Sequence, residues 1–169
     1  MDVSKIEYQA KIDFPKIEIT KPNLRDAGFL QISLAGANSE TTSILSYLYQ
    51  SYVVEPFDED IAELLKKIAK VEMHHQDLLS TMITALGGDP IIASQGRFWT
   101  GKYINYTNNL KEILSMNIEA EEQAIEFYRY SIERICTESV KEVLACIIED
   151  ELVHIKAFKE VLEYITFWK

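Results

Sequence analysis

Glu72-Met73-His74-His75 and Glu151-Leu152-Val153-His154 carry the same Glu-x-x-His pattern. In each stretch the glutamate and the last histidine are three residues apart, so in a helix they lie on one face, about one turn from each other. Two such pairs, each backed by a glutamate from another helix, form the ligand set of a dinuclear metal site in a four-helix bundle. The pattern therefore predicts a helical bundle that holds two metal ions.

Both Glu-x-x-His pairs lie on apolar helical faces. Apolar residues occur at offsets −11, −7, −4, +7 and +14 from the glutamate in both stretches. They are Ile61, Leu65, Ile68, Leu79 and Leu86 in the first stretch, and Val140, Leu144, Ile147, Phe158 and Ile165 in the second. This spacing is typical of a helix stripe that faces a core. A charged pair on a solvated face would have polar neighbours at these offsets, so both pairs are expected to be buried.

The chain divides into an irregular start and four long helical segments. The segments are expected from about Leu24 to Val54, from the Asp58 cap to Gly87-Gly88, from about Tyr106 to Ile135, and from Thr137 to about Thr166. The first and last links are short, which predicts two antiparallel hairpins. The middle link is long enough to run the length of the bundle. The expected fold is an all-α, ferritin-like four-helix bundle, two helical hairpins joined by a long crossover.

Residues 24–169 are expected to form this bundle domain, and residues 1–23 an extended N-terminal arm. The arm contains Pro15 and Pro22 and shows some apolar alternation. It could lie over the bundle or contact another subunit, and the sequence leaves both alternatives open.

The remaining two ligands follow from the helix faces on which the glutamates lie. Glu40 has mostly apolar and small neighbours on its own face of the first segment. Spacing alone points to Glu119 in the third segment, because it precedes Glu151 by 32 residues, the same interval as in the first hairpin. However, Glu119 shares its face with polar residues, whereas Glu121 shares its face with an apolar stripe. Helical facing therefore favours Glu121.

The predicted metal ligands are Glu40, Glu72, His75, Glu121, Glu151 and His154. Four carboxylates and two imidazoles suit two divalent ions of Fe or Mn. The charges of two such ions balance four carboxylates, which a buried site tolerates. Six protein ligands are too few to fill two octahedra, so open positions remain for O₂ or peroxide.

Four other residues near the predicted site have less certain roles. Asp150 could accept a hydrogen bond from the imidazole of His75 on the opposite helix, or it could be a solvated residue. Tyr47 and Tyr128 could bond the glutamates or act as redox tyrosines, or they could be ordinary core tyrosines. His74 points away from the predicted core and is expected not to bind metal.

Composition narrows the possible partners and the compartment. A net charge of −10 argues against nucleic acid, since phosphate binding needs a basic surface. No apolar run approaches the roughly 20 residues that span a bilayer, so no membrane partner is expected. No signal peptide is evident, and Cys136 and Cys146 are expected to be reduced. The expected localisation is cytoplasmic.

The chain resembles the ferritin-like di-metal carboxylate superfamily over about residues 21–166, and it is most similar to the manganese-catalase-like and rubrerythrin-like branches. The motifs that carry the resemblance are Lys21-Pro22-Asn23-Leu24, Glu40 with Tyr47-x-x-Gln50-Ser51, Glu72-x-x-His75, Leu86-Gly87-Gly88-Asp89-Pro90, Phe98-Trp99 and Asp150-Glu151-x-x-His154. The resemblance implies the same six metal ligands and an activity that removes hydrogen peroxide, by disproportionation or by reduction with an external donor.

The resemblance also implies what the protein would work with. No Cys-x-x-Cys rubredoxin module is present, so a rubrerythrin-type electron donor would be a separate protein. A homo-oligomer is expected. The alternatives to a peroxide or O₂ oxidoreductase are iron or manganese storage with ferroxidase activity, and a structural bundle that metal stabilises.

Overall fold

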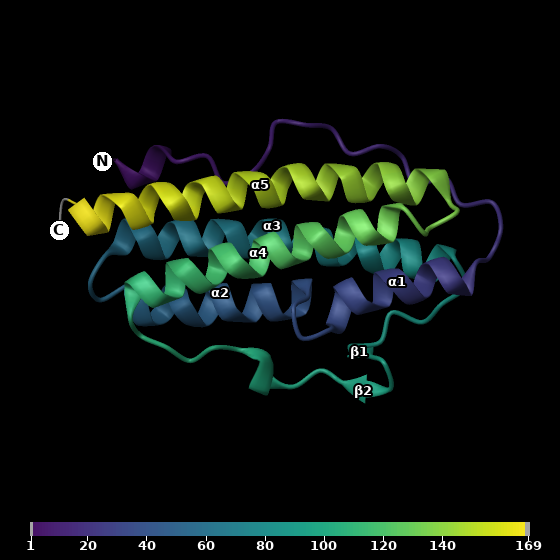
Figure 1. Ribbon diagram of the computed structural model, residues 1–169, viewed down its shortest axis with the longest axis horizontal. Helices are drawn as coiled ribbons and strands as arrows, with labels where there is room; N and C mark the ends of the chain where they lie inside the picture. The colour runs from purple at the N-terminus through teal and green to yellow at the C-terminus, as the bar shows by residue number, and fades with distance from the viewer. Residues whose placement is uncertain (1, 168–169) are drawn as a thin grey trace.

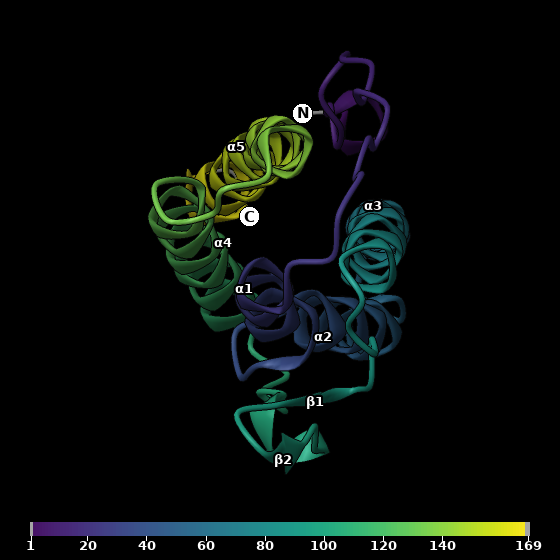
Figure 2. The same cartoon turned by 90° about the vertical axis from the view of Figure 1, so that its right-hand side faces the viewer.

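The computed structural model of the protein describes residues 2–167, and in this part of the chain helices form a four-helix bundle (Figure 1). The helices are α1 (Leu24–Ala35), α2 (Glu40–Val54), α3 (Glu59–Ala85), α4 (Leu110–Ile132) and α5 (Glu138–Phe167). Helix α2 packs mainly on α3, and α4 mainly on α5, as two hairpins. Figure 2 looks along the bundle and shows these two pairs on opposite sides. The predicted all-α, ferritin-like fold is confirmed.

The first predicted helix is broken, which corrects the expectation of one continuous segment from Leu24 to Val54. Helix α1 ends before Gly36, and α2 begins at Glu40 after a cap by Ser39. Two threonine hydroxyls at the start of α2 bond carbonyls at the end of α1: Thr41 bonds Leu34 O at 2.6 Å and Thr42 bonds Gly36 O at 3.2 Å. These bonds satisfy carbonyls that a helix end leaves without partners. The break therefore leaves few carbonyl groups at the end of α1 without a hydrogen-bond partner.

Helix α4 starts later than expected, at Leu110 instead of about Tyr106. The side chain of Asn109 accepts a hydrogen bond from the backbone N–H of Glu112 at 3.2 Å, as an N-cap does. The long crossover therefore extends to Asn109. Helix α3 begins as expected, with the Asp58 side chain accepting from the N–H of Ile61 at 3.0 Å.

The crossover contains a small hairpin that the sequence analysis did not predict. Strands β1 (Ala93–Ser94) and β2 (Arg97–Phe98) pair antiparallel around Gln95 and Gly96, which have φ values of 50° and 74°. Positive φ at both central residues is the geometry of a type I′ turn, which suits the twist of a two-residue hairpin. Just beyond it, the indole of Trp99 donates to the hydroxyl of Thr42 at 2.9 Å. The crossover thereby braces the break between α1 and α2.

The described part of the N-terminal arm, residues 2–23, lies along α3 and α5. It starts with the short 3-10 helix η1 (Val3–Lys5) and runs outside α5 in Figure 1. Val3 and Ile6 are buried, and the hydroxyl of Ser139 in α5 donates to Glu18 O at 2.9 Å. The arm therefore packs on the bundle of its own chain.

Two apolar clusters fill the two ends of the bundle. One includes Leu34 and Leu144, and the other includes Leu65 and Phe158. Buried polar side chains from four helices lie between the clusters. None of the helices in residues 2–167 combines the length and apolar character that crossing a bilayer requires. The middle of the bundle is thus the place to look for a site.

Candidate metal centre

All six predicted ligands meet in the middle of the bundle. Helix α2 supplies Glu40, α3 supplies Glu72 and His75, α4 supplies Glu121, and α5 supplies Glu151 and His154. Their exposed fractions lie between 0% and 4%. Glu119, the alternative suggested by spacing, is exposed, as is Glu122 one residue after Glu121. The structure therefore brings together the residues that helical facing selected.

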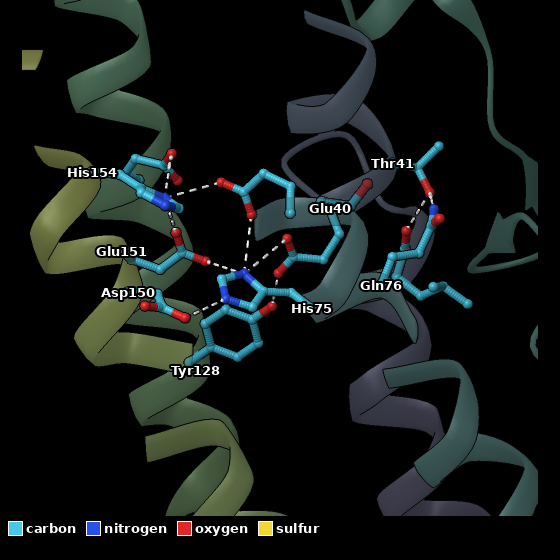
Figure 3. A network of polar contacts seen from close by, with 12 residues as sticks. Glu40, Thr41, His75, Gln76, Tyr128, Asp150, Glu151 and His154 are labelled. Atoms are coloured by element: carbon cyan, nitrogen blue, oxygen red, sulfur yellow. Dashed lines mark hydrogen bonds and ion pairs between the residues drawn. The ribbon is translucent and has the colours of Figure 1, made fainter. Parts of the chain in front are cut away.

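Two glutamates lie between the two histidines. Glu72 has one oxygen 3.1 Å from Nδ1 of His75 and the other 3.1 Å from Nδ1 of His154. Glu151 likewise reaches His154 Nδ1 at 2.9 Å and His75 Nδ1 at 3.4 Å (Figure 3). A carboxylate that faces two imidazole nitrogens at once is placed to bridge two ions.

The other two glutamates each face one histidine. Glu40 lies 3.7 Å from Nδ1 of His75, and Glu121 lies 3.5 Å from Nδ1 of His154. The donors form two groups, each with its ligand atoms within 4.8 Å of one another: Glu40, Glu72, His75 and Glu151, and Glu72, Glu121, Glu151 and His154. The groups share both bridging glutamates, so the centre has two positions related by an approximate twofold symmetry.

Glu40 and Glu121, the two outer glutamates, each accept a hydrogen bond from a tyrosine on the other hairpin. The hydroxyl of Tyr47 in α2 donates to Glu121 in α4, and the hydroxyl of Tyr128 in α4 donates to Glu40 in α2. Each hairpin thus orients the ligand of the other. Both phenols are buried, and burial with the nearby carboxylates raises the pKa of each well above its usual value, so both stay protonated at neutral pH.

Asp150 makes the two halves of the centre unequal. Its carboxylate lies 3.0 Å from Nε2 of His75, so it holds that imidazole from the side away from the ligand atoms. The residue in the equivalent place before Glu72 is Val71, which is aliphatic. The buried Nε2 of His154 has no hydrogen-bond partner among residues 2–167.

The donor set fits two cations. With its Nε2 proton donated to Asp150, neutral His75 presents the lone pair of Nδ1 to three carboxylates, those of Glu40, Glu72 and Glu151. A lone pair and three carboxylates repel one another unless a cation lies between them. His154 faces three carboxylates in the same way. Each group therefore offers the oxygen and nitrogen donors that a divalent transition metal takes.

Comparison with known proteins supports this assignment. Residues 30–162, most of the chain, match the rubrerythrin family. The chain belongs to the rubrerythrin family. The predicted membership of the ferritin-like di-metal superfamily is thereby confirmed, and family and donor set together make the chain a dinuclear metal protein for iron or manganese.

Proteins similar to this rubrerythrin-family chain include a probable manganese catalase, a manganese catalase of known structure and a bacterioferritin. A probable manganese catalase of Clostridium acetobutylicum is 24% identical, covering 89% of this chain and 76% of the relative. The bacterioferritin of Desulfovibrio desulfuricans is 26% identical, covering 83% of this chain and 78% of the relative. The crystal structure of KatB, a manganese catalase from Anabaena, superposes with a TM-score of 0.84 at 26% identity, covering 95% of this chain and 81% of KatB.

The crowded carboxylates of the metal centre shift the pKa values of its residues. Burial, with repulsion from Glu151, raises the pKa of Glu72 well above its usual range and that of Glu121 to about 7. Burial opposes ionisation of Glu151 as well, but His75 and His154 outweigh it and lower its pKa to about 2. Burial favours the neutral form of both histidines, yet the carboxylates raise their pKa well above its usual value. Protons therefore take the place of cations in the metal-free protein.

A cavity of about 230 Å³ opens onto the centre from the side of the helix break. It reaches Glu40, Glu121 and Glu151 and both buried tyrosines. Its other walls are mostly small or polar side chains from α1, the break, α2, the crossover and α4, among them Ser33, Ser39 and Ser43. The cavity gives a small molecule access to the ligands.

Two amide pairs beside this cavity were missed by sequence reasoning. Gln50 and Asn117 exchange two hydrogen bonds at 2.9 and 2.8 Å between α2 and α4. Asn38, in the break, donates to Gln123 in α4. Asn117 precedes Glu121 by four residues, so its position on the core-facing stripe was a signal that could have revealed the first pair. The second depends on the helix break and had no such signal.

Proposed function

We propose that this protein is a dinuclear oxidoreductase that removes hydrogen peroxide, either by disproportionation or by reduction with an external electron donor. The observation that carries the proposal is the pair of carboxylates, Glu72 and Glu151, that each face both histidines beside a cavity open to a small molecule. Two redox-active ions bound by these residues would together supply the two-electron change that peroxide cleavage requires.

In this proposal the chain's own residues divide three tasks among themselves. Glu72 and Glu151 would hold both ions, while the outer ligands would hold one ion each: Glu40 with His75, and Glu121 with His154. The hydroxyls of Tyr47 and Tyr128 fix the outer carboxylates and hold protons at the wall of the cavity.

The size and lining of the cavity favour a small substrate. Its volume of about 230 Å³ lies below the roughly 300–1,000 Å³ of sites for drug-sized ligands, so the cavity suits a smaller molecule. The walls offer hydroxyl and amide groups, which suit hydrogen bonds to peroxide. The two catalases among the relatives agree with this choice of substrate.

The test is metal analysis of the natively purified protein combined with an assay for O₂ released from hydrogen peroxide. Two ions of manganese or iron per chain are expected, with O₂ release if the reaction is disproportionation, or donor-dependent peroxide loss if it is reduction. Glu72→Ala and His154→Ala should abolish turnover, whereas Glu126→Ala, an exposed carboxylate of α4 that does not line the cavity, should retain it. Unchanged turnover in the first two variants would contradict the proposal.

Metal storage is a second candidate, because a bacterioferritin is among the relatives. Storage predicts a large hollow assembly with many metal ions per chain after aerobic loading with Fe²⁺. Sedimentation together with metal counting separates the two functions. A smaller homo-oligomer that holds two ions per chain supports the oxidoreductase.

A further inference from the structure

The N-terminal arm reaches the metal centre through a hydrogen bond from Ala10, and the ring of Phe14 in the arm also lies beside the ring of His75, with centroids 6.4 Å apart. The backbone N–H of Ala10 donates to Oδ1 of Asp150 at 2.7 Å. The other oxygen of the same carboxylate, Oδ2, lies 3.0 Å from Nε2 of His75 (Figure 3). An unbroken chain of hydrogen bonds therefore runs from the arm to a metal ligand.

Both oxygens of Asp150 are engaged, which fixes the orientation of its carboxylate. The side chain is fully buried, with an exposed fraction of 0%, so water does not compete for either oxygen. A carboxylate held by only one bond could turn away from the imidazole. The amide of Ala10 opposes this rotation, since turning would break a part-buried hydrogen bond.

The arm presents this amide from a well-anchored segment. Val3 and Ile6 are buried on one side of Ala10. On the other side, Phe14 packs edge-on against His74, with ring centroids 5.2 Å apart, and Glu18 accepts a bond from Ser139 in α5. Contacts on both sides keep the amide in place over the centre.

The half of the centre that contains His154 has no carboxylate equivalent to Asp150 behind its imidazole. Val71 stands where a counterpart of Asp150 would be, and the buried Nε2 of His154 has no hydrogen-bond partner in the described chain. To bind an ion through Nδ1, a neutral imidazole carries its proton on Nε2. At His154 that proton finds no acceptor within residues 2–167, whereas at His75 it is donated to Asp150.

We propose that the arm, acting through Asp150, makes the His75 position the tighter of the two metal sites, so that the ions load in order. Ala10 and Asp150 are positioning residues: they set the tautomer and direction of His75 and raise its basicity. Loss of an outer partner of a metal-binding histidine typically weakens affinity by about 10- to 100-fold. The two binding constants should therefore differ by at least about 10-fold. This inference rests on the dinuclear site of the proposed function and not on the reaction with peroxide.

The experiment is a Mn²⁺ titration of the chelator-treated full-length chain, followed by competition calorimetry and electron paramagnetic resonance. We expect two binding steps, and at one equivalent the six-line signal of isolated Mn²⁺, which is replaced by a coupled signal at two equivalents. Asp150→Asn should weaken the first step about 10- to 100-fold. Ala10→Pro removes the N–H, and with it the bond to Asp150, so it should weaken the first step in the same direction.

Matched controls separate positioning from general damage to the fold. Ile12→Pro places proline two residues along the arm, at a residue that is 39% exposed and whose N–H donates no hydrogen bond in the described structure, so both steps should keep their constants. Val71→Asp, which offers His154 a carboxylate, should tighten the second step. If Asp150→Asn does not fold, the comparison of Ala10→Pro with Ile12→Pro still tests whether the N–H of Ala10 strengthens the first binding step.

Three results would overturn the inference: equal binding constants in the unmodified protein, equal weakening of both steps by Asp150→Asn, or no difference between Ala10→Pro and Ile12→Pro. Ordered loading without peroxide turnover would support this inference while contradicting the proposed function. Peroxide turnover by a protein with two equal metal-binding constants would support the proposed function and contradict this inference.

Discussion

Removing the metal should make the stability of this protein fall as the pH rises from about 4.5 to 7. In the metal-free protein, burial and the charge of Glu151 raise the pKa of Glu121 from its usual 4.5 to about 7. The folded state therefore holds a proton that the unfolded chain has already released in this range. A group of this kind contributes stability below its unfolded pKa and loses it as the pH passes its folded pKa.

The magnitude follows from the two pKa values. An interval from 4.5 to about 7, at about 1.4 kcal/mol for each pH unit, corresponds to a loss of about 3 kcal/mol from Glu121 alone. Glu72, whose pKa is also raised, acts in the same direction. The raised pKa of His75 and His154 extends the loss above pH 6.5. Glu151, with a pKa of about 2, changes stability only between about pH 2 and 4.5.

The assay is urea unfolding of chelator-treated protein at pH 4.5, 6 and 7.5, followed by circular dichroism. Glu121→Gln should flatten the pH dependence, whereas Glu119→Gln, an exposed neighbour on the same helix, should leave it unchanged. With saturating Mn²⁺ the slope should reverse, because metal binding requires deprotonated ligands and adds stability by mass action. A metal-free protein whose stability rises between pH 5 and 7 would refute the reasoning.

Four further predictions concern the break, helix α1, Tyr128 and the unused His74. Gly36→Ala should destabilise the protein by about 1–3 kcal/mol in urea unfolding, because a Cβ there would lie 2.7 Å from a carbonyl oxygen of the preceding turn. Gly28→Ala, where a Cβ meets nothing within 4 Å, should stabilise α1 by up to about 1 kcal/mol. Tyr128→Phe removes the hydrogen bond to Glu40 and should cost about 1–3 kcal/mol of stability, and Mn²⁺ titration should show weaker binding. His74→Ala should keep two ions per chain by metal analysis, since this side chain is exposed and belongs to neither donor group.

The choice between Glu119 and Glu121 shows how far helical periodicity can reach into a site. The interval of 32 residues in the first hairpin would have selected Glu119, which the structure places on the surface. Helical facing selected Glu121, which the structure places 3.5 Å from Nδ1 of His154. Helical facing identifies the buried glutamate because the 3.6-residue period is a property of the local backbone. The number of residues between the two glutamates of a hairpin also depends on the length of the turn between the helices.

The sequence by itself determined the helical stripes, the two hairpins, the long crossover and the residues that face the core. All of these follow from periodicity and connection length, which act over a few residues at a time. The broken first helix was not predicted, because apolar periodicity continues on both sides of it. Its side-chain bonds to carbonyls are local, but the brace from Trp99 in the crossover comes from a segment that is distant in the chain.

The sequence places Asp150 before Glu151 and Val71 before Glu72, which already indicates two unequal halves, and only the tertiary structure decided what holds Asp150 in place. Asp150 was visible in the sequence as a possible partner of His75, but its second bond comes from Ala10, 140 residues away. Nothing in the local pattern of residues 2–23 indicates which amide of the arm reaches a buried carboxylate. That contact arises from packing of the arm on α3 and α5, and packing follows from the shape of the whole bundle and not from helical period.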